Sequence, residues 1–367
     1  MSQAPDVLVV GGGIIGLCAA LAAADRRLRV TVADDARPGA ASRASAGMLG
    51  PSLHGLPSST QELAFAARDF YPEFLAGLGE RSGATIGLDR SGILEIATSE
   101  SDLGLLAGRA AADARVLQQH ELTELEPALA SHPGAVHHPL DGWVDNRALM
   151  EAMWIAVARH PLIETCHARV ASIDLSGAHA RCRLAGGAHV DSERILLATG
   201  AWAGLPGLPK VVPVRPVKGE LLTLDRAVVR HVVSRSGTYA VPRGDTLLIG
   251  ATSEEAVFDP GTTARGRRWL RRAASALIPE LRHARVADHW GGLRPCSPDG
   301  LPLLGENPER PALVYACGFS RNGILLGPWA GDALGELFSG AGQSGIPREF
   351  HPARFEKIVT AHGCLTG

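Results

Sequence analysis

The stretch Val7–Gly16, VLVVGGGIIG, runs from a short apolar strand into three consecutive glycines and a fourth glycine within an apolar segment. Gly11, Gly13 and Gly16 have the G-x-G-x-x-G spacing of dinucleotide-binding folds. In that pattern the first glycine allows a tight turn, the second lets the backbone approach a pyrophosphate, and the third lets the helix pack against the strand. The stretch therefore predicts the start of a Rossmann-like α/β domain.

The residues that follow complete a βαβ unit. Apolar spacing predicts a helix over Ile14–Asp25 and a second strand over Arg29–Ala33. The first N–H groups of the helix, those of Ile14 and Ile15, are free to bind phosphate, which the positive end of the helix dipole attracts. Asp34 stands at the end of the second strand, where an acid accepts a ribose hydroxyl and favours FAD or NAD over NADP.

A second segment favours FAD over NAD. Ala40–Pro51, AASRASAGMLGP, holds mainly small residues, with Ser42, Arg43 and Ser45 at the start of an expected helix. Small side chains let a further part of a ligand approach the backbone, and a second helix start suits phosphate. A simple NAD dehydrogenase does not need this second site, although a loop without a ligand is also compatible with the sequence.

Composition places the chain among folded globular proteins. Its 367 residues are enough for two domains, and 46% are hydrophobic and 20% charged. Lys and Arg number 36 against 38 for Asp and Glu, so the net charge of −2 does not indicate a nucleic-acid partner. The one basic run, Arg265–Arg272, lies in a helical pattern and is interpreted as a solvated face.

Cysteine, histidine and N-terminal patterns indicate neither a metal site nor a targeting segment. The six cysteines form no C-x-x-C pair and the 14 histidines no H-E-x-x-H pattern, so reduced thiols and no bound metal are expected. The N-terminus lacks the basic region and cleavage site of a signal peptide. The longest apolar runs, such as Ile14–Ala24, are too short to span a bilayer. A cytoplasmic location is expected.

Strands of two kinds alternate along the chain. Arg194–Thr199 and Leu313–Ala316 are typical of buried parallel strands, whereas several strands between Val214 and Gly250 follow one another at the short spacing of an antiparallel sheet. We therefore expect the α/β class, with a Rossmann-like FAD-binding domain interleaved with an α+β substrate domain built on an antiparallel sheet. The expected boundaries are 1–80, 140–212 and 286–367 for the FAD-binding domain and 81–139 and 213–285 for the substrate domain.

Six further motifs occur in order along the chain. They are PVKGE at Pro216–Glu220, YAVPR at Tyr239–Arg243, GAT at Gly250–Thr252, GGLRP at Gly291–Pro295, SPDGLP at Ser297–Pro302 and RNGILL at Arg321–Leu326. Together with Asp6–Pro51 they resemble the FAD-dependent amino acid oxidases of the D-amino acid oxidase superfamily. Within it they are most similar to the glycine oxidase branch, the flavoenzymes of thiamine biosynthesis.

The resemblance implies roles for three residues at a substrate site. Arg294 corresponds to the arginine that holds the substrate carboxylate, which suits a planar, permanently charged group able to form two parallel hydrogen bonds. Tyr239 corresponds to a tyrosine that faces the same carboxylate, and Arg321 to an arginine close to both flavin and substrate. A structural salt bridge of Arg294 and a core position of Tyr239 are the alternatives.

The resemblance also implies a non-covalent FAD. Ala46, Gly47 and Met48 are expected to face the isoalloxazine, Val170 to offer backbone contacts to the adenine, and Phe319–Leu325 to run along the flavin ring. With the glycine-rich turn, the expected cofactor residues are Gly11, Gly13, Ile14, Ile15, Gly16, Asp34, Asp35, Ser42, Arg43, Ala46, Gly47, Met48, Val170, Gly200, Phe319, Ser320, Arg321, Asn322, Gly323, Ile324 and Leu325.

Two departures from the branch bear on the size of the substrate. Phe319-Ser320 stands where glycine oxidases have His followed by an aromatic residue, and instead resembles the G-F-S segment of the sarcosine oxidase branch. Ser253 stands where a larger apolar residue is common. Both positions are expected near the substrate pocket, so the accepted side chain or N-substituent is left open.

The activity implied by the resemblance is oxidative deamination of glycine or another small amino acid or amine. A hydride passes from Cα to flavin N5, giving a 2-oxo acid, ammonia or an amine, and hydrogen peroxide when O2 is the acceptor. The alternatives are a sarcosine or secondary-amine oxidase, a D-amino acid dehydrogenase, a subunit of a hydrogen cyanide synthase-like complex, an NAD-dependent dehydrogenase and a non-catalytic flavin-binding subunit. A homo-oligomer is compatible with the sequence.

Overall fold

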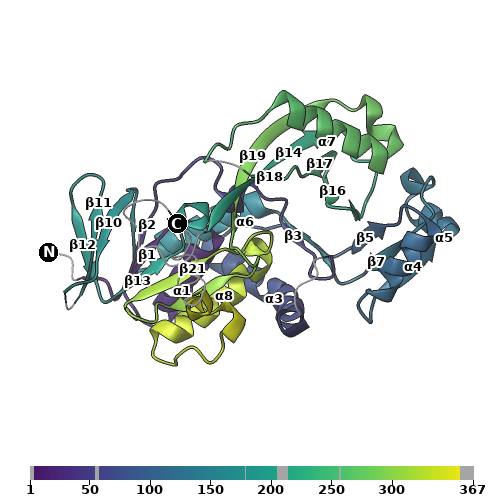
Figure 1. Ribbon diagram of the computed structural model, residues 1–367. Coiled ribbons are helices and arrows are strands. Elements are labelled where there is room, and N and C mark those ends of the chain that lie inside the picture. The colour runs from purple at the N-terminus through teal and green to yellow at the C-terminus, as the bar shows by residue number, and fades with distance from the viewer. Residues whose placement is uncertain (1–3, 54–57, 178, 205–213, 256–257, 356–367) are drawn as a thin grey trace, which may run out of the picture.

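The computed structural model describes residues 4–53, 58–177, 179–204, 214–255 and 258–355. Two large sheets dominate it, one mainly parallel and one mainly antiparallel, and helices pack on both (Figure 1). This mixed α/β architecture confirms the predicted fold class. The expected domain boundaries stay a prediction.

The parallel sheet has six strands in the order β20-β21-β13-β1-β2-β9. All neighbours run parallel except β20 and β21. The strands are β1 (Val7–Val10), β2 (Val30–Ala33), β9 (Ile163–Cys166), β13 (Arg194–Leu197), β20 (Leu303–Glu306) and β21 (Leu313–Cys317). Sequence segments far apart in the chain therefore build one sheet, as the interleaved arrangement requires.

Both faces of the parallel sheet are covered, which explains why β1 is apolar at every position. Val7 and Val9 pack under four helices, whereas Leu8 and Val10 pack under a small antiparallel sheet on the opposite face. The helices are α1 (Ile14–Asp25), α3 (Ser58–Ser82), α6 (Asn146–Arg159) and α8 (Gly323–Phe338). The small sheet consists of β10 (Val170–Asp174), β11 (Ala180–Leu184) and β12 (His189–Ser192), and η2 (Gly200–Gly204) follows β13.

The antiparallel sheet has nine strands, in the order β18-β14-β17-β16-β15-β5-β7-β6 with β19 also paired to β14. Its one parallel pair, β15 with β5, joins residues 93–138 to residues 215–296. The strands are β5 (Ile93–Ile96), β6 (Arg115–Gln118), β7 (Gly134–His138), β14 (Arg215–Leu224), β15 (Val232–Arg235), β16 (Thr238–Arg243), β17 (Thr246–Gly250), β18 (Glu254–Glu255) and β19 (Val286–Cys296).

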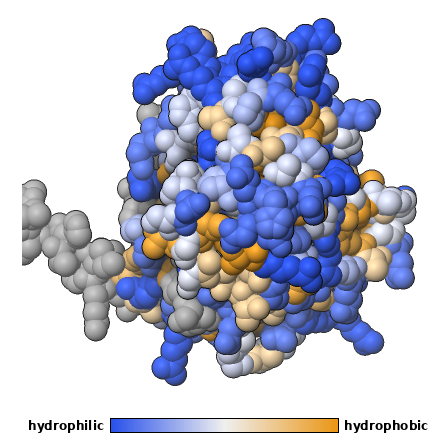
Figure 2. All heavy atoms as spheres, turned by 90° about the vertical axis from the view of Figure 1, so that its right-hand side faces the viewer, coloured by the Kyte–Doolittle hydropathy of each residue, from blue (hydrophilic) through white to orange (hydrophobic). Residues whose placement is uncertain are grey.

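Helices cover the antiparallel sheet at two places (Figure 1). The helix α7 (Ala264–Leu277) buries Leu270, Ala274 and Leu277 against strands β14 and β17 and turns its arginines outward, as expected of a solvated face. Near β5 and β7 lie α4 (Glu100–Gly108), α5 (Gln119–Leu125) and η1 (Pro127–Leu129). The short helix η3 (Pro279–His283) follows α7 in the chain. Figure 2 shows the α4 and α5 side of the molecule, where hydrophilic residues surround smaller hydrophobic patches.

A fourth sheet has three strands, β3 (Met48–Leu49), β8 (Gly142–Val144) and β4 (Leu88–Asp89), and β3 follows the short helix α2 (Ala41–Ala44) in the chain. The helices η4 (Arg348–Phe350) and η5 (Pro352–Phe355) end the described chain. No helix in the described ranges is long and apolar enough to cross a membrane. The cytoplasmic location stays a prediction.

The strand β6 was not among the expected strands, and it is extended because it pairs with β7. One local expectation needs correction. The helix expected within Ala40–Pro51 is the single turn α2, and the chain then enters β3. Val170 begins a strand of the small antiparallel sheet. The five cysteines in the described ranges are free, and Cys364 lies outside those ranges.

Candidate functional site

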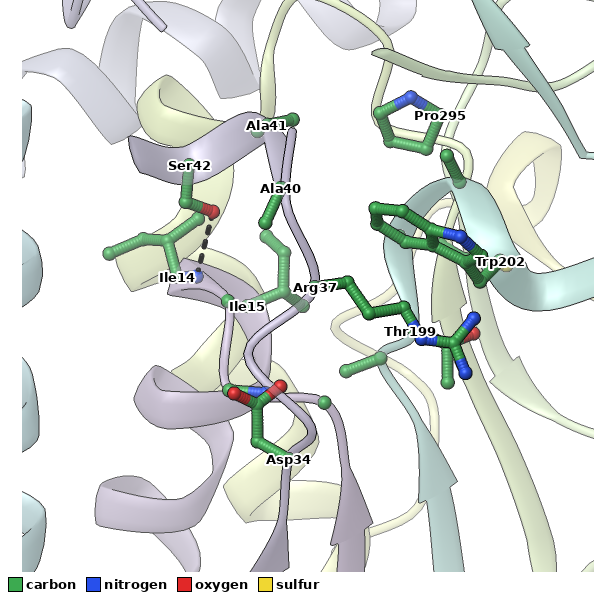
Figure 3. Close-up of a pocket in the computed structure, with 18 of the residues that line it drawn as sticks. Ile14, Ile15, Asp34, Arg37, Ala40, Ala41, Ser42, Thr199, Trp202 and Pro295 are labelled. Atoms are coloured by element: carbon green, nitrogen blue, oxygen red, sulfur yellow. Dashed lines mark hydrogen bonds between the residues drawn. The ribbon is translucent and has the colours of Figure 1, made fainter. Parts of the chain in front are cut away.

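A first cavity opens beyond the carboxyl ends of β1, β2 and β13, beside the start of α1 (Figure 3). Ligands of open α/β sheets bind at this edge. Fourteen of the expected cofactor residues line it, namely Gly11, Gly13, Ile14, Ile15, Asp34, Asp35, Ser42, Val170, Gly200, Phe319, Ser320, Arg321, Gly323 and Ile324.

The glycine-rich turn has the close contacts that its spacing predicts. Gly11 has φ +112°, and a Cβ there would lie 2.4 Å from the carbonyl oxygen of Ala198, the residue after β13. Gly16 does not line the cavity; a Cβ at this position would lie 2.0 Å from the carbonyl oxygen of Gly11. The two glycines therefore let α1 start directly against the strand edge, and its first residues, Ile14 and Ile15, line the cavity. The N–H of Ile14 is not free as expected, because it donates to Ser42.

Two side chains fix the mouth of α1. The carboxylate of Asp34 accepts hydrogen bonds from the N–H groups of Gly12 at 2.9 Å and Ala36 at 3.0 Å. The hydroxyl of Ser42 accepts one from the N–H of Ile14 at 3.0 Å (Figure 3). A separate phosphate-binding helix start was expected near Ser42, but α2 is one turn long. The segment instead brings its serine to the N-terminus of α1, so the two expected phosphate features meet at one place.

The opposite wall of the first cavity holds residues that sequence reasoning missed. Arg37 pairs with Asp35, at 2.7 Å between Nε and Oδ2, and its guanidinium lies 5.3 Å from the ring centre of Trp202. Figure 3 shows Arg37 reaching across the cavity toward Trp202, with Thr199 and Pro295 nearby. No spacing rule relates Arg37 to Trp202, because only the fold brings the loop after β2 to the turn after β13.

A second cavity adjoins the first and shares with it Ala41, Ser45, Ser320, Arg321 and Ile324. It is bounded by strands of the antiparallel sheet and extends to Glu95 and Arg109 near α4. Of the expected site residues it brings together Ala46, Gly47, Met48, Tyr239, Arg294, Ser320, Arg321, Asn322, Ile324 and Leu325.

Arg294 carries a cation that has no anionic partner among the residues that the structure describes. Its Nη1 donates to the carbonyl oxygen of Thr252 at 3.1 Å, and its guanidinium lies over Gly219, where a Cβ would come within 2.4 Å of Nη2. No carboxylate in the described part of the chain pairs with it, so the alternative of a structural salt bridge has no support. Burial lowers the pKa of Arg294, and the charge of Arg321 acts in the same direction.

Tyr239 and Arg321 both line the second cavity. The ring of Tyr239 lies over Gly250, where a Cβ would be 2.3 Å from Cζ, and the residue lines the second cavity. Burial raises the pKa of the Tyr239 phenol above its ordinary value, although the charges of Arg294 and Arg321 oppose this. The phenol is therefore a neutral hydrogen-bond donor beside two guanidinium groups. Such a site favours an anion.

Two expected residues lie elsewhere. The side chain of Arg43 is exposed and lines neither cavity, because α2 turns it outward while Ser42 faces α1. Ser253 is also exposed and lines neither cavity, although Ala251 lines the second cavity and the carbonyl oxygen of Thr252 accepts from Arg294. Ser320, by contrast, lies at the junction of the cavities with φ +49°, and its hydroxyl is 3.5 Å from the Cys296 sulfur.

The family model described as DAO, FAD dependent oxidoreductase, matches residues 6–337. The chain belongs to this family. Glycine oxidase from Geobacillus kaustophilus is 35% identical over 92% of this chain and 93% of its own length. The crystal structure of the Geobacillus kaustophilus enzyme superposes with a TM-score of 0.85 at 34% identity, covering 91% of this chain and 94% of that chain.

Two further relatives widen the comparison. Iminodiacetate oxidase from Chelativorans sp. BNC1 has a TM-score of 0.83 at 28% identity, over 91% of this chain and 95% of that chain. Hydrogen cyanide synthase subunit HcnC from Pseudomonas aeruginosa is 29% identical over 97% of this chain and 97% of its own length. The cofactor of the family is FAD, so the alternative of an NAD-dependent dehydrogenase is set aside.

The first cavity fits FAD on its own geometry. A methyl group on Gly13 would project toward Ser42, 3.2 Å from its hydroxyl, so the glycine leaves room above the first N–H groups of α1. The hydroxyl of Thr199, which also lines the cavity, is buried and has no hydrogen-bond partner in the described part of the chain. The junction with the second cavity gives a long ligand a continuous course toward Arg294.

Proposed function

We propose that this protein is an FAD-dependent oxidase of small α-amino acids or related amines that carry a free carboxylate. The observation that carries the proposal is the partly buried Arg294 guanidinium, which has no acidic partner in the described part of the chain and lies beside the neutral phenol of Tyr239. A buried cation is costly without an anion, and a ligand carboxylate supplies one. We also propose that the expected cofactor and substrate residues that line the two cavities bind FAD and the substrate.

The residues of the second cavity have separate tasks in this proposal. Arg294 holds the carboxylate of the substrate in a fork of two N–H donors, and Tyr239 donates its phenolic hydrogen to the same group. Arg321, at the junction of the two cavities, adds positive charge where the substrate meets the flavin. These contacts fix Cα in the orientation that the transfer requires, and orientation alone removes a large part of the barrier.

Bound FAD supplies the hydride acceptor for the Cα–H bond, and O2 is the proposed final electron acceptor, with hydrogen peroxide as its product. The amine nitrogen loses its proton before or during the transfer, and water then hydrolyses the resulting imine. The products are a 2-oxo acid and ammonia, or an amine when the nitrogen is substituted.

The second cavity has an apolar part beside its cations. Leu221, Ile96 and Leu106 line it together with Arg294. We propose that these apolar side chains contact an N-substituent or a short side chain of the substrate. Sarcosine, iminodiacetate and small D-amino acids are therefore proposed with glycine as substrates to test. If glycine is the substrate, a role in thiamine biosynthesis is part of this proposal.

An anaerobic reduction screen tests the proposal. Purified protein with bound FAD is mixed without oxygen with glycine, sarcosine, iminodiacetate and D-alanine, and loss of the flavin absorbance near 450 nm is followed. Ethylamine, which is similar in size to glycine and lacks the carboxylate, is the matched control. Bleaching by at least one amino acid and not by ethylamine is expected, followed by hydrogen peroxide on admission of air.

The outcomes separate the alternatives. Bleaching without peroxide formation in air indicates a dehydrogenase that passes electrons to another acceptor. Bleaching by D-amino acids or secondary amines, and not by glycine, indicates another branch of the family. Absence of bleaching by every carboxylate-bearing amine overturns the proposal and leaves a non-catalytic flavin-binding subunit.

A further inference from the structure

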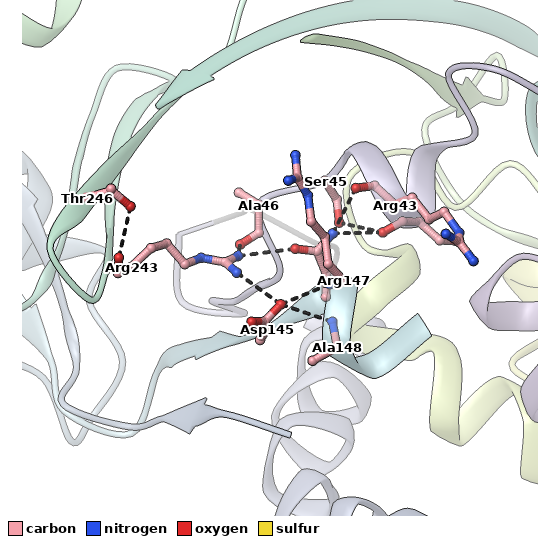
Figure 4. Close-up of polar contacts among 10 residues, drawn as sticks. Arg43, Ser45, Ala46, Asp145, Arg147, Ala148, Arg243 and Thr246 are labelled. Atoms are coloured by element: carbon pink, nitrogen blue, oxygen red, sulfur yellow. Dashed lines mark hydrogen bonds and ion pairs between the residues drawn. The ribbon is translucent and has the colours of Figure 1, made fainter. Parts of the chain in front are cut away.

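The Arg243 side chain joins the antiparallel sheet to the small-residue segment at the second cavity (Figure 4). From β16, its Nη2 donates to the carbonyl oxygen of Ala46 at 2.8 Å and to Oδ1 of Asn146 at 3.2 Å. Its Nη1 lies 3.3 Å from Oδ1 of Asp145, and the guanidinium stacks 4.3 Å from the ring centre of Trp143. One fork therefore reaches three separate acceptors.

The acceptors of Arg243 are themselves fixed. The side-chain amide of Asn146 donates to the carbonyl oxygens of Ser42 at 3.0 Å and Arg43 at 3.2 Å. Asp145 caps α6 by accepting from the N–H groups of Arg147 and Ala148 at 3.0 and 3.1 Å (Figure 4). The residues from Ser42 to Ala46 are thus held at several carbonyls, all within reach of a single connected set of polar contacts.

The same strand places Tyr239 and Arg243 on one face. Side chains two apart share a face of a strand, so Tyr239, Val241 and Arg243 point the same way, about 13 Å separating the first from the last. Val241 and Tyr239 pack with Ala46 and Met48 in one apolar cluster. Arg243 lines neither cavity, so it reaches the site only through the residues that it holds.

We propose that Arg243 is a positioning residue for the oxidation reaction. By holding the Ala46 carbonyl, it fixes the segment Ala46–Met48, which is proposed to face the flavin, relative to the strand that carries the substrate-binding Tyr239. The distance between the reacting carbon and the flavin then depends on this contact. The inference rests on the proposed function, because it takes the second cavity to be the substrate site.

A conservative variant tests the inference. Arg243→Lys keeps the charge but replaces the two Nη atoms of the planar fork by a single nitrogen at another position, so the geometry of the contacts is not kept. A displacement of about 1 Å at a reacting centre lowers the rate by about a hundredfold. We therefore expect the anaerobic rate of flavin reduction at saturating substrate to fall by about this factor, while the dissociation constant of the substrate changes by less than about threefold, since Arg294 and Tyr239 remain.

A structural control distinguishes positioning from general stability. Arg159 donates from Nη1 to the carbonyl oxygens of Arg81 and Ser82 at 3.2 and 2.8 Å, and it lines neither cavity. Arg159→Lys removes a comparable carbonyl-binding fork from α6 and is expected to leave the reduction rate within about threefold of wild type. Thermal unfolding of both variants shows how much stability each contact contributes.

The visible circular dichroism of bound FAD supplies a readout that needs no substrate. Arg243→Lys is expected to change this spectrum and Arg159→Lys to leave it as in wild type. If no amine reduces wild-type flavin, the proposed function fails, whereas the spectral comparison still tests the contact with the flavin-facing segment. Should Arg243→Lys fail to bind FAD, Asn146→Ser takes its place, because it removes the donors to Ser42 and Arg43. The inference is overturned if Arg243→Lys has the same reduction rate and the same spectrum as Arg159→Lys. It is also overturned if Arg243→Lys loses substrate affinity by as large a factor as it loses reduction rate.

Discussion

The two adjoining cavities are built in different ways. The first is formed by backbone at the edge of the parallel sheet, where Gly11, Gly13 and Gly16 stand close together in sequence. The second is formed by side chains from β16, β19 and the turn before α8, which are far apart in sequence. The glycines of the first cavity can therefore be recognised in one short sequence motif. The residues of the second cavity, the proposed substrate site, come together only when the antiparallel sheet has formed.

The charges in the two cavities also differ. In the first, Asp34 accepts two backbone N–H groups and Asp35 pairs with Arg37, so both carboxylates are satisfied within the protein. In the second, Arg294 and Arg321, which also lines the first cavity, have no carboxylate partner in the described ranges. Under the proposed function, the anionic end of the substrate is bound at Arg294, away from the two carboxylates of the first cavity. This contrast predicts that the two functions can be lost separately.

The largest effect is expected for Arg294→Met. Removal of the carboxylate-binding cation should lower kcat/KM for the best amino acid, which corresponds to an activation free energy higher by about 2–5 kcal/mol. FAD should stay bound. The measurement is steady-state peroxide formation together with the flavin content of the purified variant. Arg285→Met, which removes an 88% exposed guanidinium paired with Asp225, is the control. Near-normal kcat/KM in Arg294→Met would contradict the assignment of the second cavity.

Tyr239→Phe should have the next largest effect. Loss of a hydrogen bond to a charged group should raise the activation free energy by about 1.5–3 kcal/mol and so lower kcat/KM. Burial raises the pKa of Tyr239 above the ordinary tyrosine pKa of about 10, so its phenol stays protonated at pH values up to about 10. The ratio of wild-type to variant kcat/KM should therefore be constant between about pH 7 and pH 10. A ratio that falls within this range would show that the phenol ionises early and is not the donor.

Gly13→Ala tests the first cavity alone. The backbone of Gly13, at φ −76°, accepts a side chain, and the added methyl would face the Ser42 hydroxyl at 3.2 Å. Crowding of this kind costs about 1–3 kcal/mol, so the dissociation constant of FAD should rise by about tenfold to a hundredfold. Once loaded with FAD, the variant should be reduced at nearly the wild-type rate. Gly186→Ala, where no heavy atom lies within 4 Å of the added Cβ, is the control.

The smallest effect is expected for Arg37→Met. The guanidinium lies over Trp202 and beside Asp35 at an open wall of the first cavity, and a cation–π contact of this kind contributes about 0.5–1 kcal/mol. FAD affinity should fall by a few fold, with no change in substrate binding. Isothermal titration of the apoprotein measures this, with the exposed Arg282 as the site of a control substitution. A larger loss of substrate affinity than of FAD affinity would weaken the distinction between the two cavities.

Sequence reasoning reached the first cavity more completely than the second. Local spacing alone predicted the turn at Gly11, the helix α1 and the acid Asp34, because each depends on neighbours within one βαβ unit. Arg294 and Tyr239 were assigned by resemblance, since no spacing in the chain connects them. The structure brings both to the second cavity, but their roles remain to be tested by the substitutions above.

Other residues could not have been found from local patterns. Trp202 and Arg37 meet across the first cavity only because β2 and β13 flank β1 in the parallel sheet. The strand β6 was missed because its pairing with β7, and not its own composition, makes it extended. Arg43 and Ser42 are adjacent in sequence, yet one faces solvent and the other α1, a difference set by the single turn of α2.

The sequence by itself determined the dinucleotide-binding unit, because a glycine turn, a helix start and an acid act over a few residues of contiguous chain. The choice of FAD came from the resemblance to the family. Only the tertiary structure decided which cations lack partners and which carbonyl Arg243 holds. Pairing and burial are properties of contacts between distant segments, and such contacts exist only once β16, β19 and the small-residue segment lie around one space.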